Sequence, residues 1–105
     1  MTTDKGVKLD ADKPRMELVL GGFSKGLFKV AEVGTFGAKK YTDNGWQEVD
    51  DGINRYTGAL LRHLLSHLDG EIKDKESKLL HLSHVAWNAL AILTLYLNST
   101  IKKDA

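Results

Sequence analysis

The sequence predicts an all-α fold: a compact bundle of three main helices with an extended N-terminal arm, completed by oligomerisation. Apolar residues recur at helical spacing in three separate stretches of the chain. The segments that flank the Asn44-Gly45 turn do not alternate apolar and polar residues over enough positions to indicate a β-hairpin. A chain of 105 residues buries only about 60–70% of the surface of its unfolded form, so association with further copies is a natural way to complete the core.

The composition indicates one folded domain, residues 1–105, with neither a nucleic acid nor a membrane as partner. Hydrophobic residues make up 42% and charged residues 28%, and the net charge of +1 gives no field that would attract either surface. The apolar run 85–97 is shorter than the about 20 residues that span a bilayer. The chain has no cysteine, which excludes thiolate metal sites, and no apolar signal segment. We therefore expect a soluble, cytoplasmic protein.

Residues 1–15 are expected to form the arm, because Pro14 directs the preceding Lys13 toward extended geometry. Lys13 and Arg15 belong either to a frayed terminus or to a strap that reaches over a site, including the site of a neighbouring subunit. Residues 16–20 are apolar and could anchor the arm.

The first main helix is predicted from Ser24 to about Tyr41, with three glycines that weaken its propensity but permit close backbone approach. Lys39 and Lys40 either complement the carboxyl end of this helix or meet a phosphate, in which case Tyr41 would contact a base. The following Asn-Gly turn leads to Trp46, which is either a core residue or a stacking surface for a base.

The second helix is predicted to begin after Asp50-Asp51 and to end before Gly70. Its outer side carries Arg55, Arg62 and Asp69, while a charged link that includes Glu71 and Asp74 follows it. The third helix should run from Glu76 or Ser77 to about Asn98, ahead of a polar tail over residues 99–105. The apolar face of the second helix comprises Ile53, Thr57, Leu60, Leu61, Leu64 and Leu68.

All four histidines of the chain lie in the second and third helices, which makes this pair of helices the candidate site. His81, His84 and Asn88 share one helical face, at positions i, i+3 and i+7. An unpaired buried imidazole or amide costs roughly 1–3 kcal/mol, so these side chains need partners. Each histidine is either a satisfied structural residue or part of a site that binds phosphate, a purine edge or a metal.

Several catalytic signatures are missing. The sequence has no Walker-type loop, no Gly-x-Ser-x-Gly elbow, no His-Glu-x-x-His helix and no His-Asp doublet. The paired acidic helices of the all-α nucleoside triphosphate pyrophosphohydrolases are also not matched in full. Carboxylates for a magnesium site are limited to Glu32, Glu71 and Asp74.

Five short motifs, taken together, resemble a phage and prophage family, the dATP/dGTP diphosphohydrolase N-terminal domain. The resemblance covers most of residues 5–97 and implies an all-helical fold, a viral source and purine nucleotides as ligands. The motifs are Asp12-Lys13-Pro14-Arg15, Thr35-Phe36-Gly37-Ala38-Lys39-Lys40-Tyr41, Asn44-x-Trp46, Leu61-Arg62-His63-Leu64-Leu65 and His81-Leu82-x-His84-x-x-Trp87-Asn88. The family's motif positions in this sequence are Lys13, Arg15, Lys39, Lys40, Tyr41, Trp46, Arg62, His63, His81, His84 and Asn88.

Two function classes follow from this resemblance together with the residues. The first is a metal-dependent hydrolase of deoxypurine nucleoside triphosphates, in which His63, His81 and His84 hold Mg²⁺, Mn²⁺ or Co²⁺, or the phosphates, and the metal activates a water. Glu71 or Asp74 would assist as further metal ligands, the basic residues would neutralise phosphate charge, and Tyr41 or Trp46 would stack on the base.

The second class is a non-catalytic sponge that sequesters a nucleotide signal of host immunity, which would make the chain an anti-defence protein in the host cytoplasm. Such a protein needs phosphate donors and a stacking surface, but neither a metal nor a base. A third interpretation is a structural or partner-binding helical protein whose histidines are satisfied in the core. In each case we expect a homo-oligomer.

Overall fold

A computed structural model describes the backbone of residues 11–104 and the side chains as far as residue 99. Within this range the prediction of an all-α fold is confirmed, because the described residues form helices and no strand. The four α-helices are α1 (Glu17–Leu20), α2 (Ser24–Lys40), α3 (Gly52–Leu68) and α4 (His81–Asp104), and a short 3₁₀ helix, η2 (Gly45–Glu48), lies between α2 and α3.

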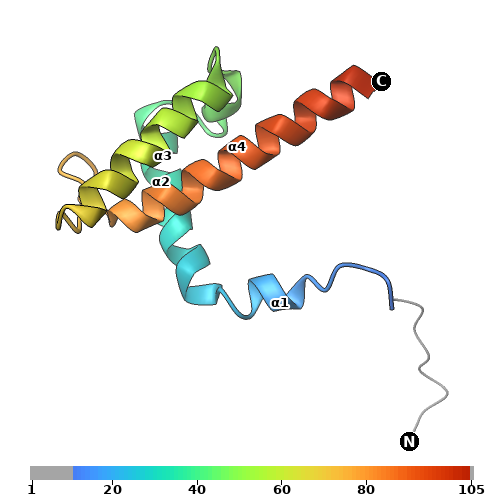
Figure 1. Cartoon of the computed structure of the whole chain (residues 1–105), viewed down its shortest axis with the longest axis horizontal. Coiled ribbons are helices and arrows are strands. Elements are labelled where there is room, and N and C mark those ends of the chain that lie inside the picture. The colour runs from blue at the N-terminus through green and yellow to red at the C-terminus, as the bar shows by residue number, and fades with distance from the viewer. Residues whose placement is uncertain (1–10, 105) are drawn as a thin grey trace, which may run out of the picture.

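Helices α3 and α4 lie side by side and are joined by the link at one end of the molecule (Figure 1). Helix α2 packs against α4, while α1 leads away from the bundle, and the carboxyl-terminal half of α4 projects beyond α3. No helix in the described part of the chain is long and apolar enough to cross a membrane. The three long helices therefore meet mainly around the first half of α4.

Small residues allow α2 and α4 to approach each other closely. Val33 of α2 and Ala91 of α4 are the buried apolar residues of the described chain. A Cβ atom placed on Gly34 would lie 3.4 Å from the indole Nε1 of Trp87. Gly34 thus occupies the point where Trp87 crosses the backbone of α2, which explains a glycine inside a helix.

The connection between α2 and α3 follows the turn that the sequence predicts. The amide of Gly45 donates to the carbonyl of Thr42 at 3.1 Å, and Asn44 adopts a left-handed conformation with φ of 57°. Asp51 also lies in the left-handed region, at the position that precedes α3. Its carboxylate accepts a hydrogen bond from the side chain of Asn54 rather than from a backbone amide.

The predicted apolar face of α3 is only partly buried. Ile53, Leu60 and Leu64 are half-buried, but Leu61 and Leu68 are exposed. Helix α3 ends as expected, since Gly70 follows it with a positive φ of 100° that favours glycine. The prediction placed Leu61 and Leu68 on the buried face because the apolar stripe of α3 is wider than the contact that α4 provides.

The predicted start of the third helix, at Glu76 or Ser77, is wrong. Helix α4 begins at His81, because Lys78 has a φ of 66°, outside the helical range, and the link folds back on itself. The predicted end of the third helix, near Asn98, is also wrong, because α4 continues to Asp104 through the predicted polar tail. A formed helix extends without a new nucleation step, so polar residues continue it.

The predicted arm lies partly outside the described residues, which begin at residue 11. Residues 11–15 are exposed and precede α1, whose four residues are exposed as well. The apolar stretch 16–20 therefore forms a helical turn without a buried side chain, and in this chain it does not anchor the arm to the bundle.

Two glycines of α2 provide a matched test of the α2–α4 contact. Gly26→Ala should raise the free energy of unfolding by up to about 1 kcal/mol, because alanine favours a helix and the new Cβ meets nothing within 4 Å. Gly34→Leu should lower it by about 1–3 kcal/mol through overpacking against Trp87. Urea denaturation followed by circular dichroism measures both, and equal effects of the two substitutions would contradict the proposed contact.

Candidate functional site

The link between α3 and α4, residues 69–80, is held in place by its own backbone hydrogen bonds. The amide of Asp74 donates to the carbonyl of Leu79 at 2.8 Å, and the amide of His81 donates to the carbonyl of Ile72 at 2.9 Å. The carboxylate of Asp74 in turn accepts from the amide of Ser77 at 2.8 Å. These bonds hold the carboxylates of the link against the first turn of α4.

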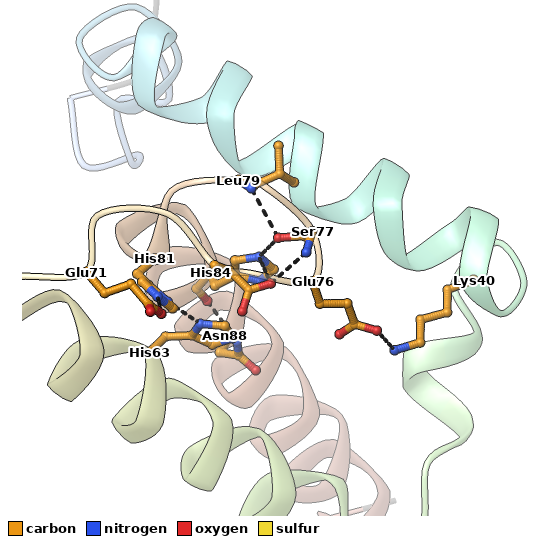
Figure 2. Close-up of polar contacts among 10 residues, drawn as sticks. Lys40, His63, Glu71, Glu76, Ser77, Leu79, His81, His84 and Asn88 are labelled. Atoms are coloured by element: carbon orange, nitrogen blue, oxygen red, sulfur yellow. Dashed lines mark hydrogen bonds and ion pairs between the residues drawn. The ribbon is translucent and has the colours of Figure 1, made fainter.

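His81 lies between the carboxylate of Glu71 and the ring of His63 (Figure 2). Its Nε2 is 2.7 Å from Oε1 of Glu71, and its Nδ1 is 2.8 Å from Nδ1 of His63. A neutral His81 that donates from Nε2 to the carboxylate presents its Nδ1 lone pair to His63. The side chain of His81 is only 4% exposed, so both contacts are largely shielded from water.

His84 forms a second pair with Ser77. Its Nε2 is 2.7 Å from the hydroxyl of Ser77, and its ring stacks on His63 with a centroid distance of 4.2 Å and an angle of 6°. Asp74 lies 4.0 Å from the same Nε2. The Asn88 side chain donates to the carbonyl of His84 at 2.8 Å. The face predicted from the sequence, which carries His81, His84 and Asn88, is indeed buried.

Burial favours the neutral form of the imidazoles. It lowers the pKa of His63 to about 4, with a further contribution from neighbouring His84. Burial likewise lowers the pKa of His84, although Asp74 opposes this effect. Neutral imidazoles keep a lone pair available to a metal or a proton at neutral pH.

The carboxylates of Glu71 and Asp74 stay ionised. The hydrogen bond from His81 lowers the pKa of Glu71, although burial opposes it. For Asp74, burial is the largest single influence and raises the pKa, but the hydrogen bonds from Ser77 and the two nearby histidines together lower it. The cluster thus places two anions beside neutral rings.

The arrangement contains one group of side chains that could hold a metal ion. One ligand atom each from His63, Asp74 and His81 lies within 4.8 Å of the others. Glu71 contacts the opposite ring nitrogen of His81 and is placed to orient that ring, as carboxylates do behind metal-bound histidines. His84 is not one of these three ligands: its Nε2 faces Ser77, although its ring stacks on His63 and its Nε2 lies 4.0 Å from Asp74.

An open cleft of about 1240 Å³ adjoins the cluster through His63 and His84. It lies between α2, α3, α4 and the segment that contains η2. Trp46, Tyr56 and Trp87 line it and pack edge to face on one another, with ring centroids 5.5–6.4 Å apart. The hydroxyl of Tyr56 donates to the carbonyl of Trp46 at 2.8 Å.

Trp46 therefore belongs to an aromatic cluster and also borders the cleft; its role as a stacking surface for a base stays a prediction.

Some of the basic residues that the sequence indicates line the cleft, and others lie outside it. Arg62 and Lys40 line the cleft with Tyr41 and Asn88. Lys40 is paired with Glu76 at 2.6 Å, and this contact raises the pKa of Lys40. Three further residues do not line the cleft: Lys39, Lys13 and Arg15, the last of which pairs with Glu17 on the exposed arm.

Sequence reasoning missed Ser77 and Tyr56, and it assigned no role to Glu76. No spacing rule connects Ser77 with His84, because a folded link rather than a helix separates them. Tyr56 could have been found from its place on α3, one turn after Ile53 and one turn before Leu60. His67 stands apart from the cluster, and its buried Nδ1 has no hydrogen-bond partner among the described residues.

The fold and the site define a helical protein with a buried histidine–carboxylate cluster beside an aromatic, partly basic cleft. A concave cleft lined by aromatic rings and a few polar groups is typical of a small-molecule binding site.

Comparison with known families identifies the chain as a member of one of them. Residues 3–105 match the family described as dATP/dGTP diphosphohydrolase, N-terminal, and the chain belongs to that family. The resemblance inferred from the five motifs is thereby confirmed. No curated protein and no solved structure shows significant similarity to the chain.

The lowered pKa of His63 predicts a sensitivity to acid. Because this pKa is about 4 in the folded protein and 6.5 without the protein's influence, the unfolded chain takes up the proton first. The contribution of His63 to stability is therefore complete above pH 6.5 and is lost as the pH falls toward 4.

Urea denaturation in the presence of a chelator, at a series of pH values, measures this effect. His63→Gln should flatten the fall in unfolding free energy over this pH window. An unchanged slope in the variant would show that His63 is not the group that titrates.

Proposed function

We propose that this protein is a metal-dependent hydrolase of deoxypurine nucleoside triphosphates. In this reaction a water oxygen forms a bond to the α-phosphorus while the bond from that phosphorus to the bridging oxygen breaks. The products are a nucleoside monophosphate and pyrophosphate, and the water gives up a proton. The family name supports a diphosphohydrolase of dATP and dGTP. The observation that carries the proposal is the group formed by His63, Asp74 and His81 beside the cleft.

The ligand types in this group favour a particular kind of cation. Two imidazole nitrogens and one carboxylate oxygen suit Mn²⁺ or Co²⁺ better than Mg²⁺, which prefers oxygen ligands. A cation held there would polarise a phosphoryl oxygen and activate the attacking water. Glu71 would fix the ring of His81 through the 2.7 Å contact, so that Nδ1 faces the group.

The cleft supplies the groups that a nucleotide needs. Arg62 lines the cleft next in sequence to His63 and would neutralise phosphate charge close to the metal group. Lys40 would leave Glu76 to contact a phosphate, and exposed Tyr41 or half-buried Trp46 would stack on the purine. Asn88, at the floor of the cleft, offers a carbonyl oxygen as hydrogen-bond acceptor.

His84 is the residue best placed to move a proton. Burial keeps its imidazole neutral by lowering its pKa, and the hydroxyl of Ser77 contacts its Nε2 at 2.7 Å. A neutral imidazole that borders the cleft can accept the proton released by the attacking water. Ser77 would hold the ring in position, and Asp74 would stabilise the imidazolium that forms.

A second candidate function is the sequestration of a nucleotide signal without turnover. The observation that favours it is that His63, His81 and Glu71 satisfy one another's hydrogen bonds directly. An aromatic cleft with Arg62 could then bind a nucleotide as a sponge does. We propose a homo-oligomer for either function.

The first prediction from this proposal concerns the fate of the ligand. Purified protein is incubated with dATP, dGTP, cyclic dinucleotides or ADP-ribose derivatives, with and without Mg²⁺, Mn²⁺ or Co²⁺. Chromatography of the ligand follows, before and after protein denaturation. A hydrolase yields the nucleoside monophosphate and pyrophosphate only with metal. His81→Asn should reduce this rate by at least about 100-fold, because a ligand of the metal is lost, whereas His67→Asn should keep it.

Three other results would reject a metal-dependent hydrolase. A ligand that disappears from solution and returns intact after denaturation would establish the sponge. Activity that does not depend on metal would show that His63, Asp74 and His81 do not act as metal ligands in the reaction. No loss of any ligand would leave the structural interpretation of the histidines.

A second prediction isolates the role of Glu71. Glu71→Gln should weaken the binding of Co²⁺ by about 10- to 100-fold, because His81 loses the anion that orients its ring. Glu76→Gln is the matched control, since Glu76 lies in the same link but pairs with Lys40. Titration calorimetry and the visible absorption of Co²⁺ report the affinity and the ligand geometry. Equal affinities for the two variants would contradict this role for Glu71.

A further inference from the structure

Helix α4 carries a second apolar surface, opposite the face that bears His81 and His84. We define this outer face by six exposed residues of α4: Leu82, Ala89, Leu90, Leu93, Tyr96 and Leu97. Leu93 is 54% exposed and Tyr96 is 59% exposed. An apolar face of a helix is normally covered by another element, yet α2 and α3 pack against the inner side of α4 and leave these residues exposed.

We infer that the outer face of α4 is the interface with a second copy of this chain, related by a two-fold axis that passes near Ala89. The inference is independent of the proposed function, because it concerns the side of α4 that faces away from the histidines.

The charge pattern supports a second copy as the occupant. Residues 82–97 contain no aspartate, glutamate, lysine or arginine. A two-fold interface brings the same surface of both partners together, so every charge on it would lie close to a like charge. A face without charge avoids this repulsion, and it also offers no anchor for a partner that is recognised by its charge.

The outer face offers a continuous apolar surface to a partner. Leu82, Leu90 and Leu97 are each 48% exposed, Leu93 is 54% exposed and Tyr96 is 59% exposed. Removing such side chains from water is the dominant favourable contribution to most associations between proteins.

The spacing of the outer face fits an antiparallel pair of α4 helices. Leu82 and Leu97 mark its ends, and Ala89, a small residue, lies next to its midpoint. When the two helices cross there, Leu82 of one copy lies near Leu97 of the other, and the alanines allow the backbones to approach closely. Both histidine clusters stay accessible, since they are on the inner side of α4.

The chain has no cysteine, which makes single-cysteine cross-linking specific. Ala89→Cys should form a disulfide-linked dimer under mild oxidation, because the two-fold axis brings the two thiols together. Thr57→Cys, which places a thiol on the exposed outer side of α3, is the matched control and should stay monomeric in denaturing electrophoresis.

A pair of charge substitutions tests the same interface in solution. Leu93→Glu should weaken dimerisation by roughly 30-fold or more, as the loss of a central apolar contact does. Leu65→Glu places the same charge on α3 at an equally exposed leucine and should leave the dimer intact. Light scattering after size-exclusion chromatography gives the mass, and circular dichroism confirms that each variant is folded.

Four results would overturn the inference: a monomeric wild-type protein, a dimer that Leu93→Glu leaves unchanged, a dimer lost in Leu65→Glu alone, or cross-linking of Thr57→Cys in place of Ala89→Cys. A monomer that floats with phosphatidylcholine–phosphatidylglycerol vesicles would assign the outer face to a lipid surface instead. If Leu93→Glu does not fold, the cross-linking of Ala89→Cys decides alone.

Discussion

The arrangement of this protein depends on the hydrogen-bond partners that the buried polar side chains of α4 need, His81, His84 and Asn88 among them. His81, His84 and Asn88 lie on the side of the helix that faces the bundle, where an unpaired polar group is costly. Glu71 and Ser77 satisfy the two imidazoles. Those contacts require the link to fold back over the start of α4, so the position of the link and the interior of the bundle are determined together.

Because polar groups occupy much of the interior of the bundle, apolar side chains remain at its surface. The buried positions of the first half of α4 are largely occupied by polar groups, and Val33 and Ala91 are the buried apolar residues among those described. Many leucines of α3 and α4 are therefore left at the surface. A small chain with polar side chains in its interior buries less apolar surface and gains less stability from it. Association between copies can bury more apolar surface and so add stability.

The histidine cluster and the cleft combine two electrostatic environments within a short distance. Burial keeps His63 and His84 neutral by lowering their pKa values, while hydrogen bonds keep the carboxylates of Glu71 and Asp74 ionised. The cleft beside them adds a guanidinium and aromatic rings. The neutral imidazoles, the anionic carboxylates and the cationic side chains of the cleft are the features on which the proposed metal and polyphosphate site rests.

The sequence by itself determined the helical class, the extents of α2 and α3 to within a residue or two, the turn at Asn44 and the clustering of the histidines. Local rules govern these features, because helical periodicity, glycine at a helix end and Asn-Gly at a turn act over a few residues.

Only the tertiary structure decided which groups meet across the chain. The start of α4 moved to His81 because the left-handed Lys78 and the backbone bonds of the link prevent an earlier helix. The pairing of Ser77 with His84, the separation of Lys39 from the cleft and the exposure of Leu61 and Leu68 followed from packing between distant segments. Periodicity indicates which residues share a face of a helix, but the partner of that face is set by the three-dimensional path of the chain.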